Sequence, residues 1–141
     1  MGSRLSITIR NDISEVSRLA DIIELFGRTN KVAASSTFEI NLVMDEVLAN
    51  IIMHGFPDID EHIIEIKISL NGETFSAEIV DDGIAFNPLK STKDDRGASL
   101  EEKGIGGLGI HIIKKYMDKV AYKRVSNKNV LMIKKVVTIE Q

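Results

Sequence analysis

The feature that most constrains the fold is an uninterrupted stretch of helix-forming residues in the first half of the chain. Thr37–His54 contains neither glycine nor proline and is rich in strong helix formers, so the sequence predicts a single helix here. Ser35 or Ser36 is expected to cap this helix, with Glu39 completing a capping box after Ser36. Gly55 is expected to end it. At about 100° per residue, apolar side chains cover most of the circumference, which is the pattern of a buried helix.

Polar residues interrupt this apolar surface along one narrow stripe, which contains Glu39, Glu46 and Asn50. A carboxylate and a carboxamide one turn apart on a buried helix are costly unless a partner satisfies them. A metal ion or a polar ligand would explain Glu46 and Asn50. The same Glu-x-x-x-Asn pattern is common on solvated helix faces, so the pattern alone leaves both interpretations open.

Hydrophobic periodicity predicts the remaining elements, because strands alternate with a period of two and helices with a period near 3.6. In chain order we expect a strand at Arg4–Arg10, a helix from Asn11 or Asp12 to about Phe26 closed by Gly27 and Asn30, the long helix, strands at His62–Leu70 and Glu73–Val80 joined by an Asn71-Gly72 turn, a helix starting at Ile110, and strands at Lys119–Val125 and Val130–Ile139. Hairpin strands with grouped helices indicate an α+β fold, a two-layer sandwich of one mixed sheet with three helices on one face. No repeat or linker divides the chain, so residues 1–141 are expected to form one domain.

Parity distinguishes two neighbouring acidic residues at the end of the second hairpin strand. The apolar residues up to Ile79 share the buried face, and Asp81 has the same parity, whereas Asp82 falls on the other side. The sequence therefore predicts that Asp81 points inward beneath the helices and is the candidate binding residue. Asp-Gly pairs also open ordinary turns, so a purely structural role before Gly83 is the alternative.

Two stretches after this strand have the composition of ligand-binding loops. Ala85–Lys103 shows no periodicity, which in a compact domain is typical of a lid or a binding loop. Its cations are candidates for phosphate contacts or simply for a solvated loop: Lys90, Lys93, Arg96 and Lys103. Gly104–Gly109 then leads into a helix, and glycine lets a backbone approach a ligand while the amides of a helix start attract anions. The glycine run follows no strand and lacks the Lys-Ser/Thr of a P-loop, so neither dinucleotide-binding nor P-loop chemistry is indicated.

Composition excludes several functional classes. The net charge is −3, so nothing indicates a nucleic-acid-binding surface. The chain has no cysteine, which excludes disulfides and thiolate metal sites, and His54, His62 and His111 lack the spacing of metal ligands. No apolar run is long enough to cross a bilayer, so we expect a cytoplasmic protein that binds neither membranes nor nucleic acid.

Three motifs stand in a fixed order along the chain. They are Glu46-x-x-x-Asn50, Asp81-x-Gly83-x-Ala85 and Gly104-x-Gly106-Gly107-Leu108-Gly109. Together with the loop between the last two, they make the whole chain resemble the GHKL ATPase superfamily of gyrases, histidine kinases and MutL, which has the Bergerat nucleotide-binding fold. In its short length and in the sequence around Asn50, the chain is most similar to the small anti-sigma-factor serine kinases.

The resemblance implies ATP and Mg²⁺ as cofactors and assigns a role to each motif. Asn50 would coordinate Mg²⁺ through its side-chain oxygen, and Glu46 would be the general base on the attacking hydroxyl. Asp81 would accept a hydrogen bond from the adenine amine, while Gly83 lets the backbone pass the base. The glycine-rich loop would offer backbone amides to the phosphates, from Gly104, Gly106, Gly107, Leu108 and Gly109.

The chain departs from the family pattern at two positions. Ala85 stands where the Asp-x-Gly-x-Gly box has its last glycine. Asn129-Val130 stands near the last strand, where the family often has Gly-Thr with the threonine assisting the acidic residue. His54 matches a family histidine at the helix end, for which we expect a structural role.

The expected function is that of a serine/threonine-protein kinase acting as an anti-sigma regulatory factor. It would use ATP and Mg²⁺ to phosphorylate a STAS-type anti-anti-sigma partner and would bind a sigma factor. The alternative is an ATP-gated protein-binding module, an anti-sigma or signalling regulator with little or no phosphotransfer. A histidine kinase fragment is disfavoured because no phosphoacceptor helix pair precedes the motifs, and a gyrase- or MutL-type ATPase would need a transducer domain. Apolar alternation of Leu5, Ile7 and Ile9 on an edge strand suggests a homodimer through a sheet edge or a helix face.

Overall fold

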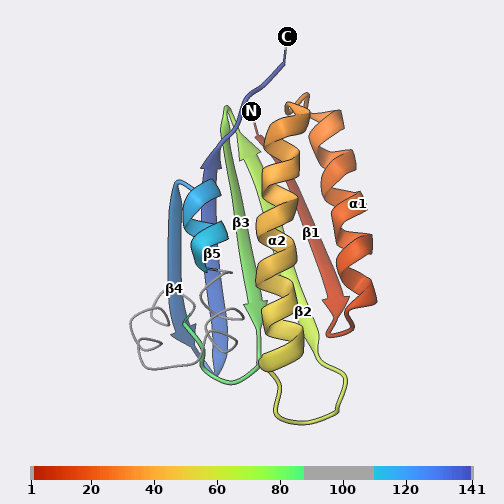
Figure 1. The fold of residues 1–141 in the computed structure, drawn as a ribbon, viewed down its shortest axis with the longest axis vertical. Helices are drawn as coiled ribbons and strands as arrows, with labels where there is room; N and C mark the ends of the chain where they lie inside the picture. Colours follow the sequence, from red (N-terminus) through yellow and green to blue (C-terminus); the bar gives the residue numbers. More distant parts are fainter. Residues whose placement is uncertain (1, 88–109, 141) are drawn as a thin grey trace.

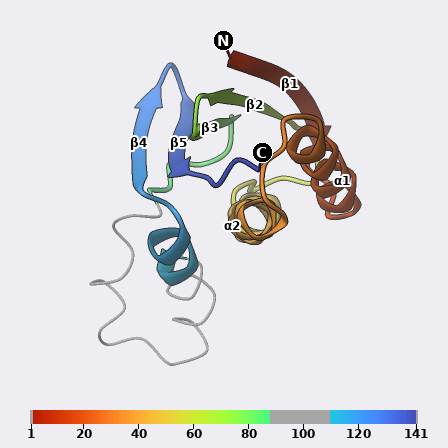
Figure 2. The ribbon, with the colours of Figure 1, turned by 90° about the horizontal axis from the view of Figure 1, so that it is seen from above.

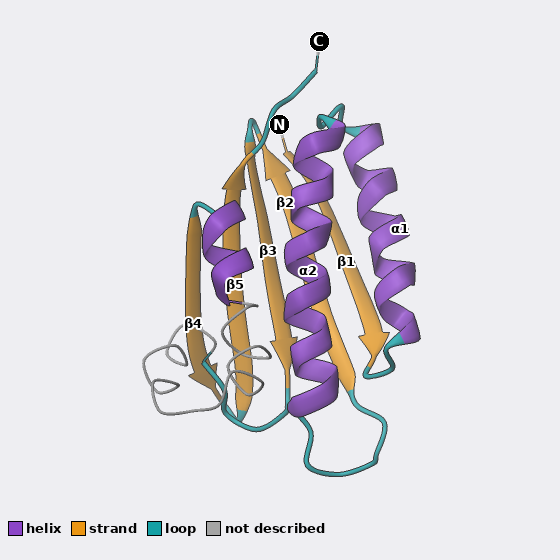
Figure 3. Ribbon diagram, viewed as in Figure 1, coloured by secondary structure: helices purple, strands orange, loops and turns teal. Residues whose placement is uncertain are grey.

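The computed structural model describes residues 2–87 and 110–140 of the chain. The elements in chain order are β1 (Gly2–Arg10), α1 (Ser14–Thr29), α2 (Ala34–His54), β2 (Ile63–Asn71), β3 (Thr74–Asp81), β4 (Lys119–Val125) and β5 (Lys128–Val136). Residues 110–116 are also helical. Figures 1 and 3 show one sheet with the helices in front of it. The strand order across the sheet is β1-β2-β3-β5-β4.

All the helices of the described residues cover one face of the sheet. Figure 2, seen from above, shows α1, α2 and the helix at 110–116 on the same side. The predicted α+β two-layer sandwich is therefore confirmed. The predicted mixed sheet is wrong, because each neighbouring pair of described strands is antiparallel.

The connections explain why these strand pairs are antiparallel. α1 and α2 run in opposite directions, so together they return the chain to the end of the sheet where β1 stopped (Figure 1). β2 must then run back alongside β1. In the described part of the connection after β3, the helix at 110–116 leads the chain to the opposite end of the sheet (Figure 1). β4 therefore runs in the same direction as β3. β5 lies between these two strands and opposes both.

The hydrophobic core lies between the sheet and α2. Inward-facing residues such as Ile66 on β2 and Ile79 on β3 are fully buried, as their periodicity predicts, and Val43 of α2 is fully buried against them. α2 is not buried all round, contrary to the expectation, because its outer side faces solvent in a single layer of helices. Phe38 and Met53 are each 65% exposed. Neither α2 nor any other helix in the described residues has the unbroken apolar length that a bilayer requires.

The capping box predicted for the start of α2 is wrong. No side chain caps this helix, although Gly55 ends it as expected. The Ser36 hydroxyl accepts a hydrogen bond from the Thr138 N–H at 3.1 Å, and Glu39 Oε1 lies 2.7 Å from Lys135 Nζ. Both side chains of the expected box therefore contact the C-terminal part of the chain, which local sequence spacing does not reveal.

Gly27 lies inside α1 rather than at its end, so this predicted boundary is also wrong. α1 continues to Thr29. A Cβ atom at Gly27 would lie 2.5 Å from Thr37 Oγ1 on α2. The glycine therefore lets the two helices pack closely, which explains a residue of weak helix propensity at this position.

β1 lies at the edge of the sheet, but its apolar residues are not exposed. Ile7 is 8% and Ile9 is 1% exposed, and both belong to the core cluster that the helices cover. The apolar alternation that suggested a homodimer is therefore explained by the core of the monomer.

A charged cluster fixes the start of α1 to β1. Glu15 is 6% exposed and accepts hydrogen bonds from Arg18 Nε at 2.8 Å and from the Arg10 backbone N–H at 2.9 Å. These donors, Arg18 foremost, lower the pKa of Glu15 to about 2. The folded state therefore favours the ionised carboxylate.

Replacing Glu15 with Gln should reduce the acid sensitivity of the fold. A carboxyl group with a lowered pKa stabilises the folded state fully above its unfolded pKa of about 4.5, and this contribution is lost as the pH falls towards the folded pKa of about 2. We expect the wild-type Tm to fall across this window, and Glu15→Gln to start from a lower Tm and fall less. Thermal unfolding followed by circular dichroism measures both slopes.

The matched control for this experiment is Glu24→Gln, which removes an exposed pair with Arg28 on the same helix. Exposed pairs contribute little, so this variant should keep the wild-type slope. Equal slopes for wild type and Glu15→Gln would contradict the role of the cluster.

Candidate functional site

A small cavity lies where the C-terminal end of α2 faces the ends of β3 and β5. It has a volume of about 160 Å³ and a mostly apolar wall. Its lining residues are Val47, Asn50, Ile51, His54, Gly55, Asp81, Ile84, Phe86, Ile113, Tyr122, Asn129 and Leu131. Pockets for drug-sized molecules usually hold about 300–1,000 Å³, so this space suits one planar ring system. The cavity brings together Asn50 and Asp81, two of the predicted site residues.

Asp81 lies in the cavity wall, as its parity predicted. It is 4% exposed, whereas Asp82 is exposed to solvent. Asp81 Oδ1 accepts hydrogen bonds from the Gly83 N–H at 2.8 Å and from Asn129 Nδ2 at 3.0 Å. No described residue donates a hydrogen bond to Asp81 Oδ2. Among the described residues, Asn41 Oδ1 is the one fully buried side-chain polar atom without a partner, so Asp81 Oδ2 is not fully buried. Asp81 Oδ2 is therefore accessible and available to a donor on a ligand.

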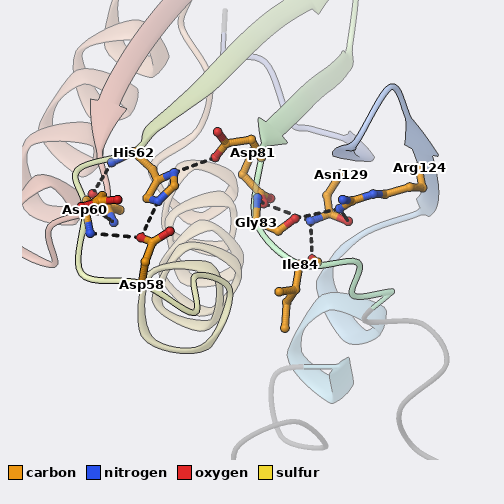
Figure 4. Close-up of polar contacts among 10 residues, drawn as sticks. Asp58, Asp60, His62, Asp81, Gly83, Ile84, Arg124 and Asn129 are labelled. Atoms are coloured by element: carbon orange, nitrogen blue, oxygen red, sulfur yellow. Dashed lines mark hydrogen bonds and ion pairs between the residues drawn. The ribbon is translucent and has the colours of Figure 1, made fainter.

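Asn129 joins Asp81 to the loop that follows β3 (Figure 4). It is 6% exposed, and its Nδ2 also donates to the Ile84 carbonyl oxygen at 2.8 Å. Its Oδ1 accepts hydrogen bonds from three donors: the Tyr122 hydroxyl, Arg124 Nη1 at 3.1 Å and the Phe86 N–H at 3.3 Å. The departure from the Gly-Thr pattern thus preserves a direct contact with Asp81, made here by a carboxamide.

Gly83 allows a close contact between the end of α2 and the loop after β3. A Cβ atom at Gly83 would lie 2.4 Å from the Gly55 carbonyl oxygen and 3.0 Å from Asp81 Oδ1. The Ile84 N–H donates to the same Gly55 carbonyl at 2.8 Å. A side chain at Gly83 would therefore disturb both this hydrogen bond and the Asp81 carboxylate. The expectation that Gly83 lets the backbone pass the base of a nucleotide stays a prediction. The same holds for any role of Ala85, which is exposed and does not line the cavity.

Glu46 and Asn50 are half-buried on α2, and only Asn50 lines the cavity. Neither side chain has a hydrogen-bond or ion-pair partner among the described residues. No cluster of three or more histidine or acidic side chains in these residues could hold a metal ion alone. One carboxamide oxygen suits Mg²⁺ when the ion arrives with phosphate oxygens and water, so Asn50 fits a nucleotide-bound ion.

The predicted phosphate-binding loop lies outside the described residues, so its role stays a prediction. This applies to Gly104, Gly106, Gly107, Leu108 and Gly109, and to the loop cations Lys90, Lys93, Arg96 and Lys103. The helix at 110–116, which follows, is tied to α2. Lys135 Nζ donates to the Tyr116 carbonyl oxygen at 3.0 Å and lies 2.7 Å from Glu39 Oε1.

A histidine cluster connects the loop after α2 to the end of β3 (Figure 4). His62 Nε2 lies 2.7 Å from Asp58 Oδ1, and His62 Nδ1 lies 3.0 Å from Asp82 Oδ1. Phe56 stacks on the imidazole with ring centroids 4.4 Å apart. The hydrogen bond with Asp58, and then that with Asp82, raises the pKa of His62 against the opposing effect of burial. This cluster was not predicted from the sequence, because the two acidic partners of His62 lie 4 and 20 residues away along the chain and no local pattern links them.

The His62 cluster should hold residues 55–62 most firmly at mildly acidic pH. A histidine with a raised pKa gives its full stabilisation below the unfolded pKa of about 6.5 and loses it as the pH rises through the folded value. We expect amide exchange in this loop, corrected for intrinsic rates, to be faster at about pH 8.5 than at about pH 6. Hydrogen exchange with mass spectrometry measures this difference.

His62→Gln should remove the pH dependence, whereas His111→Gln, at an exposed histidine on the helix at 110–116, should leave it unchanged. A wild-type loop whose exchange does not change between these two pH values would show that the charge on His62 does not hold it.

Three residues were not predicted as site residues: Tyr122 and Asn129, which line the cavity, and Arg124, which contacts Asn129. Strand pairing brings them to the site, because Asp81 on β3 is opposite Asn129 on β5, and Asn129 is opposite Arg124 on β4. Parity along β4 places Val120, Tyr122 and Arg124 on one face. The sequence shows this alternation along β4, but it does not predict that β3 pairs with β5.

The fold and the site define a class of protein. An antiparallel sheet carries all described helices on one face, and an acidic residue at a strand end faces a cavity beside a long helix. This is the arrangement of a GHKL-type ATPase domain. A family model of the histidine kinase-like ATPase domain matches residues 9–135, and the chain belongs to this family.

Several known proteins are similar to this chain. The serine/threonine-protein kinase BtrW of Bordetella bronchiseptica is 26% identical over 102 residues, which cover 72% of each chain. Anti-sigma F factor of Oceanobacillus iheyensis is 28% identical over 82 residues, 58% of this chain and 56% of that protein. The solved structure of the blue-light activated histidine kinase of Erythrobacter litoralis EL346 has a TM-score of 0.57 at 16% identity, over 88% of this chain and 41% of that one. This last similarity shows the shared fold.

Proposed function

We propose that this protein is an ATP- and Mg²⁺-dependent serine/threonine-protein kinase that acts as an anti-sigma regulatory factor. Its proposed substrate is a STAS-type anti-anti-sigma protein, and a sigma factor is its second partner. The observation that carries the proposal is the cavity in which Asp81 keeps one free carboxylate oxygen beside Asn50. The similarity to a serine/threonine-protein kinase and to anti-sigma F factor supports the choice of substrate and partner.

The base of the nucleotide is proposed to occupy the cavity. Its exocyclic amine would donate to Asp81 Oδ2, the oxygen that no described residue uses. Apolar side chains such as Ile51 and Leu131 would pack on the ring and exclude water from this hydrogen bond. The hydrogen bond from Ile84 to Gly55 would keep the wall in place.

The polar residues of α2 would act on the phosphate end of the ligand. Asn50 would give its carboxamide oxygen to the magnesium ion that the phosphates carry. Glu46, one turn earlier on α2, would accept the proton of the incoming serine hydroxyl. The hydroxyl oxygen would then attack the γ-phosphorus of ATP, and the bond between this phosphorus and the β–γ bridging oxygen would break, so that ADP leaves. Backbone amides of the glycine-rich loop are proposed to hold the phosphates in line.

Phosphotransfer is tested by incubating the protein with γ-labelled ATP, Mg²⁺ and each STAS-domain protein of the same organism. We expect one of these proteins to become labelled on serine or threonine, and EDTA to prevent it. No labelled partner, from a protein that calorimetry shows to bind ATP, would contradict kinase activity.

A second candidate function is an ATP-gated protein-binding module with little or no phosphotransfer. The position of Glu46 favours it, because this side chain lies outside the cavity wall. Pull-down of STAS-domain proteins and sigma factors with and without Mg-ATP distinguishes the two functions. Capture that depends on ATP, without a labelled product, would identify the module.

We also propose that residues 1–141 form one ATP-binding kinase domain that works in the cytoplasm as a homodimer. β1 supports the dimer, because its outer edge pairs with no strand in the described residues. Light scattering after gel filtration measures the mass in solution, and a monomer at all concentrations would contradict this part of the proposal.

A further inference from the structure

Asp81, Asn129 and Arg124 form a row across three adjacent strands beside the cavity. Asp81 on β3 is opposite Asn129 on β5, which is opposite Arg124 on β4. Their side chains meet in Figure 4, where Asn129 lies between the other two. Cross-strand neighbours on one face of a sheet interact directly. The position of Arg124 on β4 can therefore affect that of the Asp81 carboxylate through Asn129.

The carboxamide of Asn129 can take only one orientation in this row. Its Nδ2 faces two acceptors, Asp81 Oδ1 at 3.0 Å and the Ile84 carbonyl oxygen at 2.8 Å. Its Oδ1 faces the donors of Arg124 and of the Phe86 backbone. A flipped amide would place its oxygen against the carboxylate and its NH₂ against these donors. The partners therefore fix which end of the amide faces Asp81.

Arg124 supports the same wall from its other side. Its Nη1 donates to the Gly83 carbonyl oxygen at 2.8 Å and to Asn129 Oδ1 at 3.1 Å. The Gly83 N–H, in turn, donates to Asp81 Oδ1. Arg124 thus holds both groups that occupy Oδ1 of the carboxylate.

We propose that Asn129 and Arg124 are positioning residues that keep Asp81 Oδ1 occupied and Oδ2 facing the cavity as a fixed acceptor, so that the site selects a base with an exocyclic amine over one with a carbonyl. This inference rests on the proposed nucleotide binding. A carboxylate held by only one donor can rotate and adapt, so losing the Asn129 contact should lower discrimination between the two bases. A residue that only stabilised the fold would weaken all ligands equally.

The first test compares ATP with ITP, whose base carries a carbonyl in place of the adenine amine. Calorimetry measures both affinities for wild type and for Asn129→Leu, which keeps the size of the side chain and removes its polar atoms. We expect the variant to bind ATP about tenfold more weakly, while the ATP-to-ITP ratio falls by a similar factor. An unchanged ratio would overturn the inference.

The second test uses pH. Asn129→Asp would place a second carboxylate about 3 Å from Asp81 Oδ1, and two carboxylates at this distance disfavour ionisation of both. At low pH one of them takes up a proton and again provides a donor. We expect ATP affinity relative to wild type at the same pH to be low at about pH 8 and to recover towards pH 5. A relative affinity that does not change with pH would count against the inference.

A matched pair on β4 tests Arg124. Arg124→Met should lower the ATP-to-ITP ratio, whereas Lys123→Met removes the neighbouring cation, which is exposed, and should not. This pair leaves Asn129 in place, so it also decides the matter if the Asn129 variants fail to fold. Equal ratios for both variants and wild type would overturn the role of Arg124.

The outcomes separate this inference from the proposed function. Wild type that binds ATP, with variants that keep its affinity and ratio, overturns the inference alone. Wild type that binds ATP with altered variants, but transfers no phosphate, supports the inference and overturns the kinase. Wild type that binds neither nucleotide overturns both.

Discussion

Asp81→Asn should weaken ATP binding by about 10- to 150-fold, the range expected for one hydrogen bond to a charged group. In the wild type, Gly83 and Asn129 both donate to Oδ1 of this carboxylate. A carboxamide has a single oxygen, and these two donors would retain it. Its NH₂ group would then face the amine of adenine, so that two donors meet without an acceptor.

The same substitution should reverse the base preference. Inosine carries a carbonyl where adenosine carries the amine, and the new NH₂ group can donate to it. We therefore expect Asp81→Asn to bind ITP more tightly than ATP. Calorimetry with both nucleotides measures this change.

Asp82→Asn is the control for this experiment, because this neighbouring acid is exposed and contacts His62 instead of the cavity. It should keep the wild-type preference. ATP affinity that is unchanged in Asp81→Asn would remove Asp81 from base recognition.

Glu46→Gln should reduce the rate of phosphotransfer by about 10²- to 10⁴-fold, the usual contribution of a general base. ATP affinity should change little, because Glu46 does not line the cavity and has no partner among the described residues. Glutamine keeps the shape of the side chain but cannot accept the hydroxyl proton. Single-turnover assays with labelled ATP and the STAS-type partner separate the rate of transfer from binding.

The matched control is Asp45→Asn, which removes the neighbouring exposed carboxylate on α2. It should transfer phosphate at nearly the wild-type rate. If Glu46→Gln transfers as fast as this control, Glu46 is not the general base.

Periodicity predicted the parts of the fold that depend on burial. The inward position of Asp81 followed from the alternation of β3, because a strand buried on one face gives every residue a definite side. β4 was also predicted with its observed bounds, Lys119–Val125. The α+β sandwich followed from the order of these elements.

Tertiary contacts decided the features that sequence reasoning missed. Ser36 and Glu39 have the spacing of a capping box. In the structure, Ser36 contacts Thr138 instead, and Glu39 contacts Lys135. Gly27 resembles a helix end, although the approach of Thr37 explains it. These partners lie far apart in the chain or on another element, so local patterns carry no signal for them.

The role of Asn129 shows why a departure from a family pattern needs a structure to interpret it. In the sequence, Asn129-Val130 in place of the family's Gly-Thr showed only that the chain departs from the family pattern here. In the structure, the carboxamide of Asn129 donates a hydrogen bond to Asp81 Oδ1 and accepts one from Arg124 on the edge strand β4. The contact depends on the register of three strands, which no spacing along the chain specifies.

The most direct test of the central claim is a crystal structure of the protein with ADP and Mg²⁺. We expect to find the adenine in the cavity, its exocyclic amine within hydrogen-bond distance of Asp81 Oδ2, and the magnesium ion beside Asn50 Oδ1. An empty cavity in crystals grown at saturating ADP, or adenine bound with Asp81 Oδ2 unused, would contradict it.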